Sequence, residues 1–229
     1  MIRAVIFDLD NTLVDFMEMK EGAIGAAIDA MIDAGLPMLR EEARKRIFEI
    51  YEEEGIEYQR VFDHFLQDAL GEIDPKVLAA GIVGYRKARE AAMVLYPHAT
   101  LTLIELAKMG LKLVVVSDAP RFQAWLRLAE LHLLHIFDHV VTFDDTGERK
   151  PHPAPFQKAL SLLGMEPSEV LMVGDWAERD IVGAAQLGMK TVFARYGDRF
   201  GTLESGADYE IDDICDVLEI VAGEMKDEG

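Results

Sequence analysis

The sequence contains one cysteine, Cys215, among its 229 residues. One cysteine cannot form an intrachain disulfide, and along the chain it has no second cysteine or neighbouring histidine that would suggest a metal site. We therefore expect a protein of a reducing, cytoplasmic compartment.

Long hydrophobic runs are also absent. No stretch reaches the roughly 18 consecutive apolar residues of a membrane-spanning helix. Residues 1–10 are a short apolar run that ends in two aspartates, and they lack the apolar centre of a signal peptide. We expect a soluble protein without a membrane partner.

Positive charge is scarce. The chain has 23 Lys and Arg against 42 Asp and Glu, which gives a net charge of −19 at pH 7. An electric field of that sign repels nucleic-acid backbones and anionic lipid headgroups, so neither is an expected partner. A site for a phosphate substrate would need its own positive potential, from a metal ion, a lysine or backbone N–H groups.

Apolar residues are abundant, since half of the chain is hydrophobic and only 28% is charged. A chain of this size and composition fits a packed core domain with a smaller insert. Short apolar runs predict buried strands at residues 3–9, 111–116, 139–143, 170–173 and 191–194. From the second run onward, helical patterns alternate with these strands at residues 120–133, 156–163 and 177–187. The alternation predicts a doubly wound, Rossmann-like parallel α/β sheet.

About a hundred residues separate the first predicted strand from the second, which is too long for one crossover connection. The intervening sequence has helical patterns at residues 17–34, 39–54, 57–70 and 74–93. A further helix at residues 100–109 returns the chain to the sheet. We therefore predict a core domain of residues 1–14 and 96–229, with a helical domain of residues 15–95 inserted after the first strand.

Polar side chains follow the predicted strands, where ligands bind in open α/β sheets. In chain order these candidates are Asp8, Asp10, Thr12, Ser117, Asp118, Lys150, Asp175 and Asp180. We expect Asp8, Asp10 and Asp175 to converge at one edge of the sheet. Two like charges about 4 Å apart repel by about 4 kcal/mol at an effective dielectric constant near 20. A hard divalent cation with oxygen ligands relieves that repulsion, and Mg²⁺ fits this role.

Four ordered segments carry a resemblance to a known family. They are the run Asp8-Leu9-Asp10-Asn11-Thr12-Leu13, Ser117 after a hydrophobic strand, Lys150-Pro151, and Gly174-Asp175 with Asp180 beyond. In this order and at these strand ends they resemble the four motifs of the haloacid dehalogenase superfamily. The helical insert is similar to the cap domain of that superfamily's first cap class.

The resemblance implies a phosphatase with an aspartyl-phosphate intermediate. Asp8 is then the nucleophile, and Asp10 donates a proton to the leaving oxygen and later takes one from water. Residues two apart on a strand share a face, so both carboxylates can reach one phosphate. The resemblance implies that the Asp8 carboxylate, the Asp10 backbone carbonyl and Asp175 hold Mg²⁺.

The remaining candidates have supporting roles in this comparison. Ser117 and Lys150 bind the phosphoryl group, and Thr12 and Asp118 complete the substrate-binding set. Asp180 supports the metal ligands without binding the ion itself. Asp118 departs from the commonest family pattern, which has asparagine at that position, and it could equally cap the helix that begins near Pro120. Asp180 could likewise cap the helix predicted at residues 177–187.

Two other functions remain open at this stage. A phosphomutase would use Asp8 to move a phosphoryl group between two positions of a sugar, and a non-catalytic phosphate-binding protein would keep the fold without turnover. Dehalogenases and phosphonatases of the superfamily typically lack the acid two residues after the nucleophile, so Asp10 disfavours both. The sequence leaves the particular phosphate ester and the oligomeric state open.

Overall fold

The computed structural model describes residues 1–225, which form two compact units. The sheet unit comprises Met1–Asp15 and the chain from Val94 onward, and the helical unit comprises Phe16–Met93.

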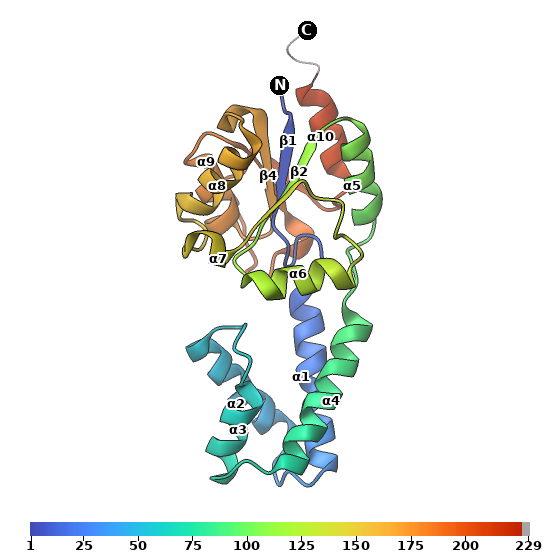
Figure 1. The fold of residues 1–229 in the computed structure, drawn as a ribbon, viewed down its shortest axis with the longest axis vertical. Coiled ribbons are helices and arrows are strands. Elements are labelled where there is room, and N and C mark those ends of the chain that lie inside the picture. Colours follow the sequence, from blue (N-terminus) through green and yellow to red (C-terminus); the bar gives the residue numbers. More distant parts are fainter. Residues whose placement is uncertain (226–229) are drawn as a thin grey trace. The chain divides into compact units, whose positions relative to one another are not determined.

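The sheet unit is built on six parallel strands in the order β3-β2-β1-β4-β5-β6 (Figure 1). The strands are β1 Ala4–Phe7, β2 Lys112–Val116, β3 His139–Val141, β4 Val170–Gly174, β5 Lys190–Ala194 and β6 Tyr209–Ile211. This arrangement confirms the predicted Rossmann-like α/β fold. Strand β6 has no counterpart among the predicted strands, because a three-residue strand with Glu210 at its centre is too short to show a hydrophobic period.

Helices cover both faces of this sheet, with α8 and α9 on one side and α5 and α10 on the other (Figure 1). The helices are α5 Ala99–Lys108, α6 Arg121–Glu130, α7 Phe143–Thr146, α8 Pro153–Leu163, α9 Val182–Ala185 and α10 Asp216–Glu224. Three single turns complete the unit: η1 Pro167–Glu169, the π-turn η2 Ala177–Ile181 and η3 Arg195–Gly197. Because both faces are covered, all four residues of β1 are fully buried, which explains its uninterrupted apolar sequence.

The helical unit consists of α1 Phe16–Asp33, α2 Arg40–Glu54, α3 Val61–Leu70 and α4 Pro75–Ala92. Its own apolar core includes Ile24, Ile28 and Phe65, all of which are fully buried. Helices α1 and α4 pack closely because Gly84 lacks a side chain: a Cβ there would lie 2.7 Å from the Ala26 carbonyl oxygen. Within the described residues, we find no helix with the length and apolarity needed to cross a bilayer.

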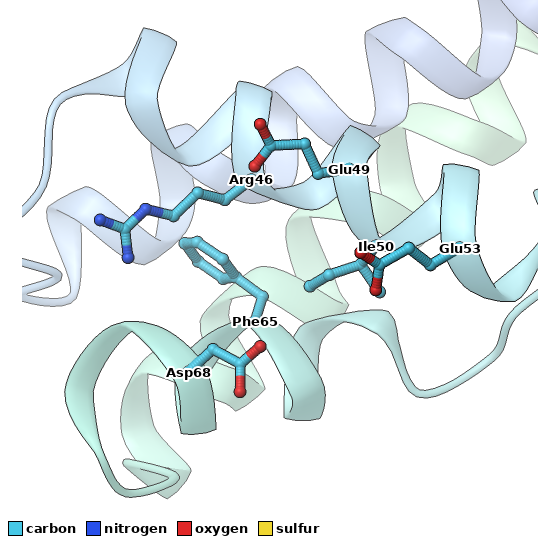
Figure 2. A pocket seen from close by; sticks show the side chains of 6 residues that line it. All are labelled: Arg46, Glu49, Ile50, Glu53, Phe65 and Asp68. Carbon is cyan, nitrogen blue, oxygen red and sulfur yellow. The ribbon is translucent and has the colours of Figure 1, made fainter.

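A hollow of about 290 Å³ lies between α2 and α3 of the helical unit (Figure 2). Its lining residues are Arg46, Glu49, Ile50, Glu53, Phe65 and Asp68. Arg46 pairs with Glu42 on the same helix, and none of the candidate site residues lines the hollow.

Candidate active site

The parallel sheet brings three chemistry-bearing residues to one edge. Asp8 follows the central strand β1, while Ser117 and Asp175 follow the neighbouring strands β2 and β4. The Asp8 N–H donates to the Val173 carbonyl at 2.9 Å, which extends the strand pairing as far as the carboxylate. The carboxyl ends of parallel strands meet at the same edge, and this is the physical basis of the convergence predicted from the sequence.

Lys150 lies at the centre of the site and is only 4% exposed. Its Nζ atom is 2.6 Å from Asp8 Oδ1 and 2.6 Å from Asp180 Oδ1. Its backbone N–H donates to Asp118 Oδ1 at 2.9 Å, so both ends of the lysine are held. The buried ammonium supplies the local positive charge that a phosphate requires in a protein of net charge −19.

Three buried carboxylates surround this lysine. Oxygen atoms of Asp8, Asp175 and Asp180 all lie within 4.8 Å of one another. One ammonium against three carboxylates leaves two negative charges uncompensated when all are ionised. That imbalance, together with the all-oxygen donor set, fits a hard divalent cation.

The pKa directions reflect this imbalance. Burial raises the pKa of Asp8 to about 7, with the Asp180 and Asp10 charges adding to the effect and Lys150 opposing it. Burial also raises the pKa of Asp175 well above its ordinary value, with Asp8 contributing. Burial alone would lower the pKa of Lys150, but Asp180 and Asp8 outweigh it and raise that pKa above its usual value. Lys150 therefore stays protonated. Burial and the crowding of negative charge instead raise the pKa values of Asp8 and Asp175.

The structure places Asp180 in this cluster, whereas the sequence analysis had grouped the Asp10 carboxylate with Asp8 and Asp175. Asp180 lies on the π-turn after β4, where its Oδ2 accepts from the Trp176 N–H at 3.0 Å. Its close approach depends on Gly174, because a Cβ there would lie 2.4 Å from the Asp180 carboxyl group.

The Asp10 carboxylate has different surroundings. Its Oδ2 accepts from Nη1 of Arg127 at 3.0 Å, and its side chain is 22% exposed. Arg127 comes from α6 and is buried. Arg127 is not among the candidates predicted from the sequence, although a charged residue between Ala124 and Leu128 on the apolar side of a helix is a signal that could have identified it.

The side chains of three further candidate residues form hydrogen bonds with other groups of the protein. Thr12 is fully buried and its hydroxyl donates to Asp175 Oδ1 at 2.9 Å. Asp118 accepts from the Lys150 N–H and, at 3.1 Å, from Arg179 Nη1. Ser117 Oγ accepts from the Ala119 N–H at 3.2 Å. These hydrogen bonds brace Asp175, Lys150 and the loop after β2.

The segment after β5 also supports the site, and the sequence analysis did not identify it. The Tyr196 hydroxyl donates to the Thr12 carbonyl at 2.8 Å. A Cβ at Gly197 would lie 1.8 Å from the Asn11 carbonyl oxygen, so only glycine fits there. Asn11 itself has a left-handed backbone with φ of 60°. No motif in the sequence marks these contacts, because they join residues that are far apart in the chain.

Comparisons with known proteins identify the family of this chain. A haloacid dehalogenase-like hydrolase model matches residues 2–188. The chain is 37% identical to a protein named glyceraldehyde 3-phosphate phosphatase from Methanocaldococcus jannaschii, over 99% of this chain and 100% of that protein. It is also 37% identical to the protein of the same name from Methanothermobacter thermautotrophicus, over 96% of this chain and 100% of that protein.

A solved structure is also similar to the whole chain. The crystal structure of a HAD phosphatase from Thermococcus onnurineus aligns with a TM-score of 0.71 and 28% identity, covering 97% of this chain and 99% of that one. Family model, relatives and fold agree with the resemblance carried by the four motifs. The chain belongs to the haloacid dehalogenase-like hydrolase family.

Proposed function

We propose that this protein is a Mg²⁺-dependent phosphatase that hydrolyses a small phosphate monoester in the cytoplasm through an aspartyl-phosphate intermediate. The observation that carries the proposal is the position of Lys150, whose Nζ lies 2.6 Å from both Asp8 and Asp180 inside a cluster completed by Asp175. In this arrangement a carboxylate suited to nucleophilic attack lies beside a fixed ammonium group at the carboxyl edge of the parallel sheet.

The uncompensated carboxylates support a divalent cation at this position. Asp8, Asp175 and the backbone carbonyl of Asp10 would hold Mg²⁺. Asp180 would orient the neighbouring side chains without binding the ion. When bound, the ion offsets the repulsion between the Asp8 carboxylate and the phosphoryl oxygens. Oxygen-only donors favour Mg²⁺ over softer metals.

The side chains of the protein carry the two chemical steps. Asp8 attacks phosphorus, the ester P–O bond breaks, and the leaving oxygen takes a proton from Asp10. Asp10 then takes a proton from water as the water oxygen attacks phosphorus, which releases inorganic phosphate and restores Asp8. Lys150 and Ser117 bind phosphoryl oxygens throughout, and Lys150 remains charged.

Thr12 and Asp118 take positioning roles in this proposal, although the sequence analysis placed them in the substrate-binding set. The Thr12 hydroxyl orients Asp175, and Asp118 fixes the backbone of Lys150 and the side chain of Arg179. Their polar atoms are used by protein groups, so they act on substrate through these partners.

The names of the relatives support a particular phosphate ester as the substrate of this chain. Two proteins 37% identical to this chain over almost its full length are named glyceraldehyde 3-phosphate phosphatase. We assign glyceraldehyde 3-phosphate to this chain as its substrate, and we assign the helical unit the role of a cap domain that selects the leaving group.

A phosphate-release assay on the full chain tests the proposal. The substrates are glyceraldehyde 3-phosphate and a panel of sugar and nucleotide monophosphates, with Mg²⁺ or with EDTA. We expect glyceraldehyde 3-phosphate to have the highest kcat/KM and EDTA to abolish turnover until Mg²⁺ is restored. An isomerised sugar phosphate formed without free phosphate would identify a mutase, and no turnover across the panel would identify a binding protein.

Asp8→Asn tests the nucleophile in the same assay. We expect kcat to fall by roughly 10⁴-fold, because the variant has no nucleophile. Asp212→Asn is the matched control, since Asp212 is exposed and belongs to the same unit. Near wild-type turnover by Asp8→Asn would contradict the assignment.

A further inference from the structure

A second group of side chains with metal-binding chemistry lies on the sheet unit. It consists of His98, directly before α5, and Asp213 and Cys215, directly before α10. One donor atom from each lies within 4.8 Å of the other two. No histidine lies near Cys215 along the chain, but the fold brings His98 close to it, although 115 residues separate His98 from Asp213.

Two hydrogen bonds already link the three residues. His98 Nδ1 lies 2.7 Å from Asp213 Oδ2, and the Cys215 N–H donates to Asp213 Oδ1 at 2.9 Å. The second contact fixes the direction of the carboxylate between the imidazole and the thiol. Helices α5 and α10 lie side by side on one face of the sheet, which brings the two segments together (Figure 1).

The donor set consists of one nitrogen, one oxygen and one sulfur. Mg²⁺ prefers oxygen alone, whereas imidazole and thiolate together favour zinc. We propose that His98, Asp213 and Cys215 bind a zinc ion on the surface of the sheet unit, with water in the fourth position. This site is separate from the carboxylate cluster around Lys150 and selects a different metal.

The geometry allows such an ion after small side-chain rotations. Zinc ligands stand about 2.0 to 2.3 Å from the metal, so donors around one ion lie about 3 to 4 Å apart. The contact of His98 with Asp213 must therefore open slightly, and any donor pair near the present upper limit of 4.8 Å must close to about 4 Å. His98 and Asp213 can make these adjustments, because their side chains are 55% and 35% exposed.

The surrounding charge favours a cation. The segment 208–216 contains five acidic residues and no lysine or arginine, and of the five Glu210 is paired with Arg195 from outside the segment. Asp216 lies next to the thiol, with its Oδ1 3.9 Å from Cys215 Sγ. A cation at this position is attracted by the local field and by the overall negative charge of the protein.

Zinc at this position would join the start of α5 to the segment before α10. Binding to the folded state alone stabilises that state, so zinc raises the thermal stability of the protein. Turnover does not depend on this site, because none of its residues belongs to the catalytic cluster.

Cobalt(II) titration of the full chain tests the proposal, in excess Mg²⁺ so that the carboxylate cluster is occupied. We expect one equivalent of cobalt to produce a thiolate-to-cobalt charge-transfer band that zinc removes. Asp8→Asn is the control and should keep the band. Cys215→Ser should lose it, and absence of the band in the wild-type protein would overturn the proposal.

His98→Gly provides a second test in a variant that we expect to fold. His98 has a φ of 64°, which glycine adopts without strain. In the wild-type protein we expect zinc to raise the Tm and to slow alkylation of Cys215 by iodoacetamide at least tenfold. His98→Gly should lose both effects and keep its phosphatase rate. Equal zinc protection in the wild type and in His98→Gly would show that the histidine is not a ligand.

Discussion

Two aspartates separated by one residue have different surroundings, and this difference underlies their proposed roles. Asp8 is buried and paired with Lys150, whereas Asp10 is partly exposed and paired with Arg127 on α6. A carboxylate fixed beside an ammonium is suited to nucleophilic attack, and one nearer to solvent can exchange its proton with water.

Asp10→Asn separates the two proton transfers. p-Nitrophenyl phosphate has a leaving group that needs no proton, so we expect the variant to phosphorylate Asp8 but to hydrolyse the intermediate slowly. The expected result is a burst of about one nitrophenolate per protein, followed by a steady rate reduced at least 10²-fold. Rapid-mixing absorbance measures the burst, and mass spectrometry locates the phosphate. A uniformly slow reaction without a burst would contradict the second role of Asp10.

Gly174→Ala tests the position of Asp180. A Cβ at residue 174 would lie 2.4 Å from the Asp180 carboxyl group, so we expect the Asp180 side chain to shift from its position beside Lys150. If Asp180 supports the metal ligands as proposed, the Mg²⁺ concentration for half-maximal activity should rise by about 10-fold to 100-fold. Gly223→Ala is the control, since a Cβ there has nothing within 4 Å. Similar Mg²⁺ requirements in both variants would show that Asp180 tolerates displacement.

At the scale of elements, helix ends and close contacts shape the helical unit. Asp74 caps α4: its Oδ1 accepts from the N–H of Lys76 at 2.8 Å and of Val77 at 3.3 Å, directly before Pro75 at the first helical position. Helix α4 then packs along α1 through the contact at Gly84. The start of α4 therefore stabilises a large part of this unit.

Asp74→Ala should lower the free energy of unfolding by about 1 kcal/mol, because two N–H groups of the first turn lose their acceptor. Urea unfolding followed by far-UV circular dichroism measures the change. Asp74→Asn should recover most of the loss, since asparagine is also a good cap. Glu72→Ala, at an exposed position just before the helix, serves as the control, and an equal loss in that variant would refute the capping role.

At the scale of the whole molecule, stability depends on the charge buried at the site. Burial raises the pKa of Asp8 from 3.8 to about 7, so folding favours the protonated form of this group. The folded state then holds more protons than the unfolded state between these two pH values. Stability from this group is present below pH 3.8 and is lost as the pH rises through about 7.

Comparison of wild type with Asp8→Asn in EDTA tests this dependence. We expect the stability advantage of Asp8→Asn over wild type to grow between pH 4 and pH 7, because asparagine has no proton to lose. Thermal unfolding across this pH range measures the difference, and Mg²⁺ should reduce it by stabilising the ionised carboxylate. A constant difference across the range would contradict an elevated pKa for Asp8.

The sequence by itself determined the fold class and which candidate residues stand at the ends of neighbouring strands. Apolar runs of strand length, alternating with helical patterns, predicted the parallel sheet, and Asp8, Ser117 and Asp175 could be placed at one edge because they directly follow neighbouring strands. These features are local, since they depend on hydrophobic period and on the residue after each run.

Tertiary structure alone decided which distant side chains meet. Asp180 reaches Lys150 because the π-turn folds back over Gly174, and Arg127 reaches Asp10 from a helix 117 residues away. His98 likewise meets Cys215 only when α5 and α10 pack on the same face. Such contacts follow from how helices pack on the sheet, and no local period in a sequence records that packing.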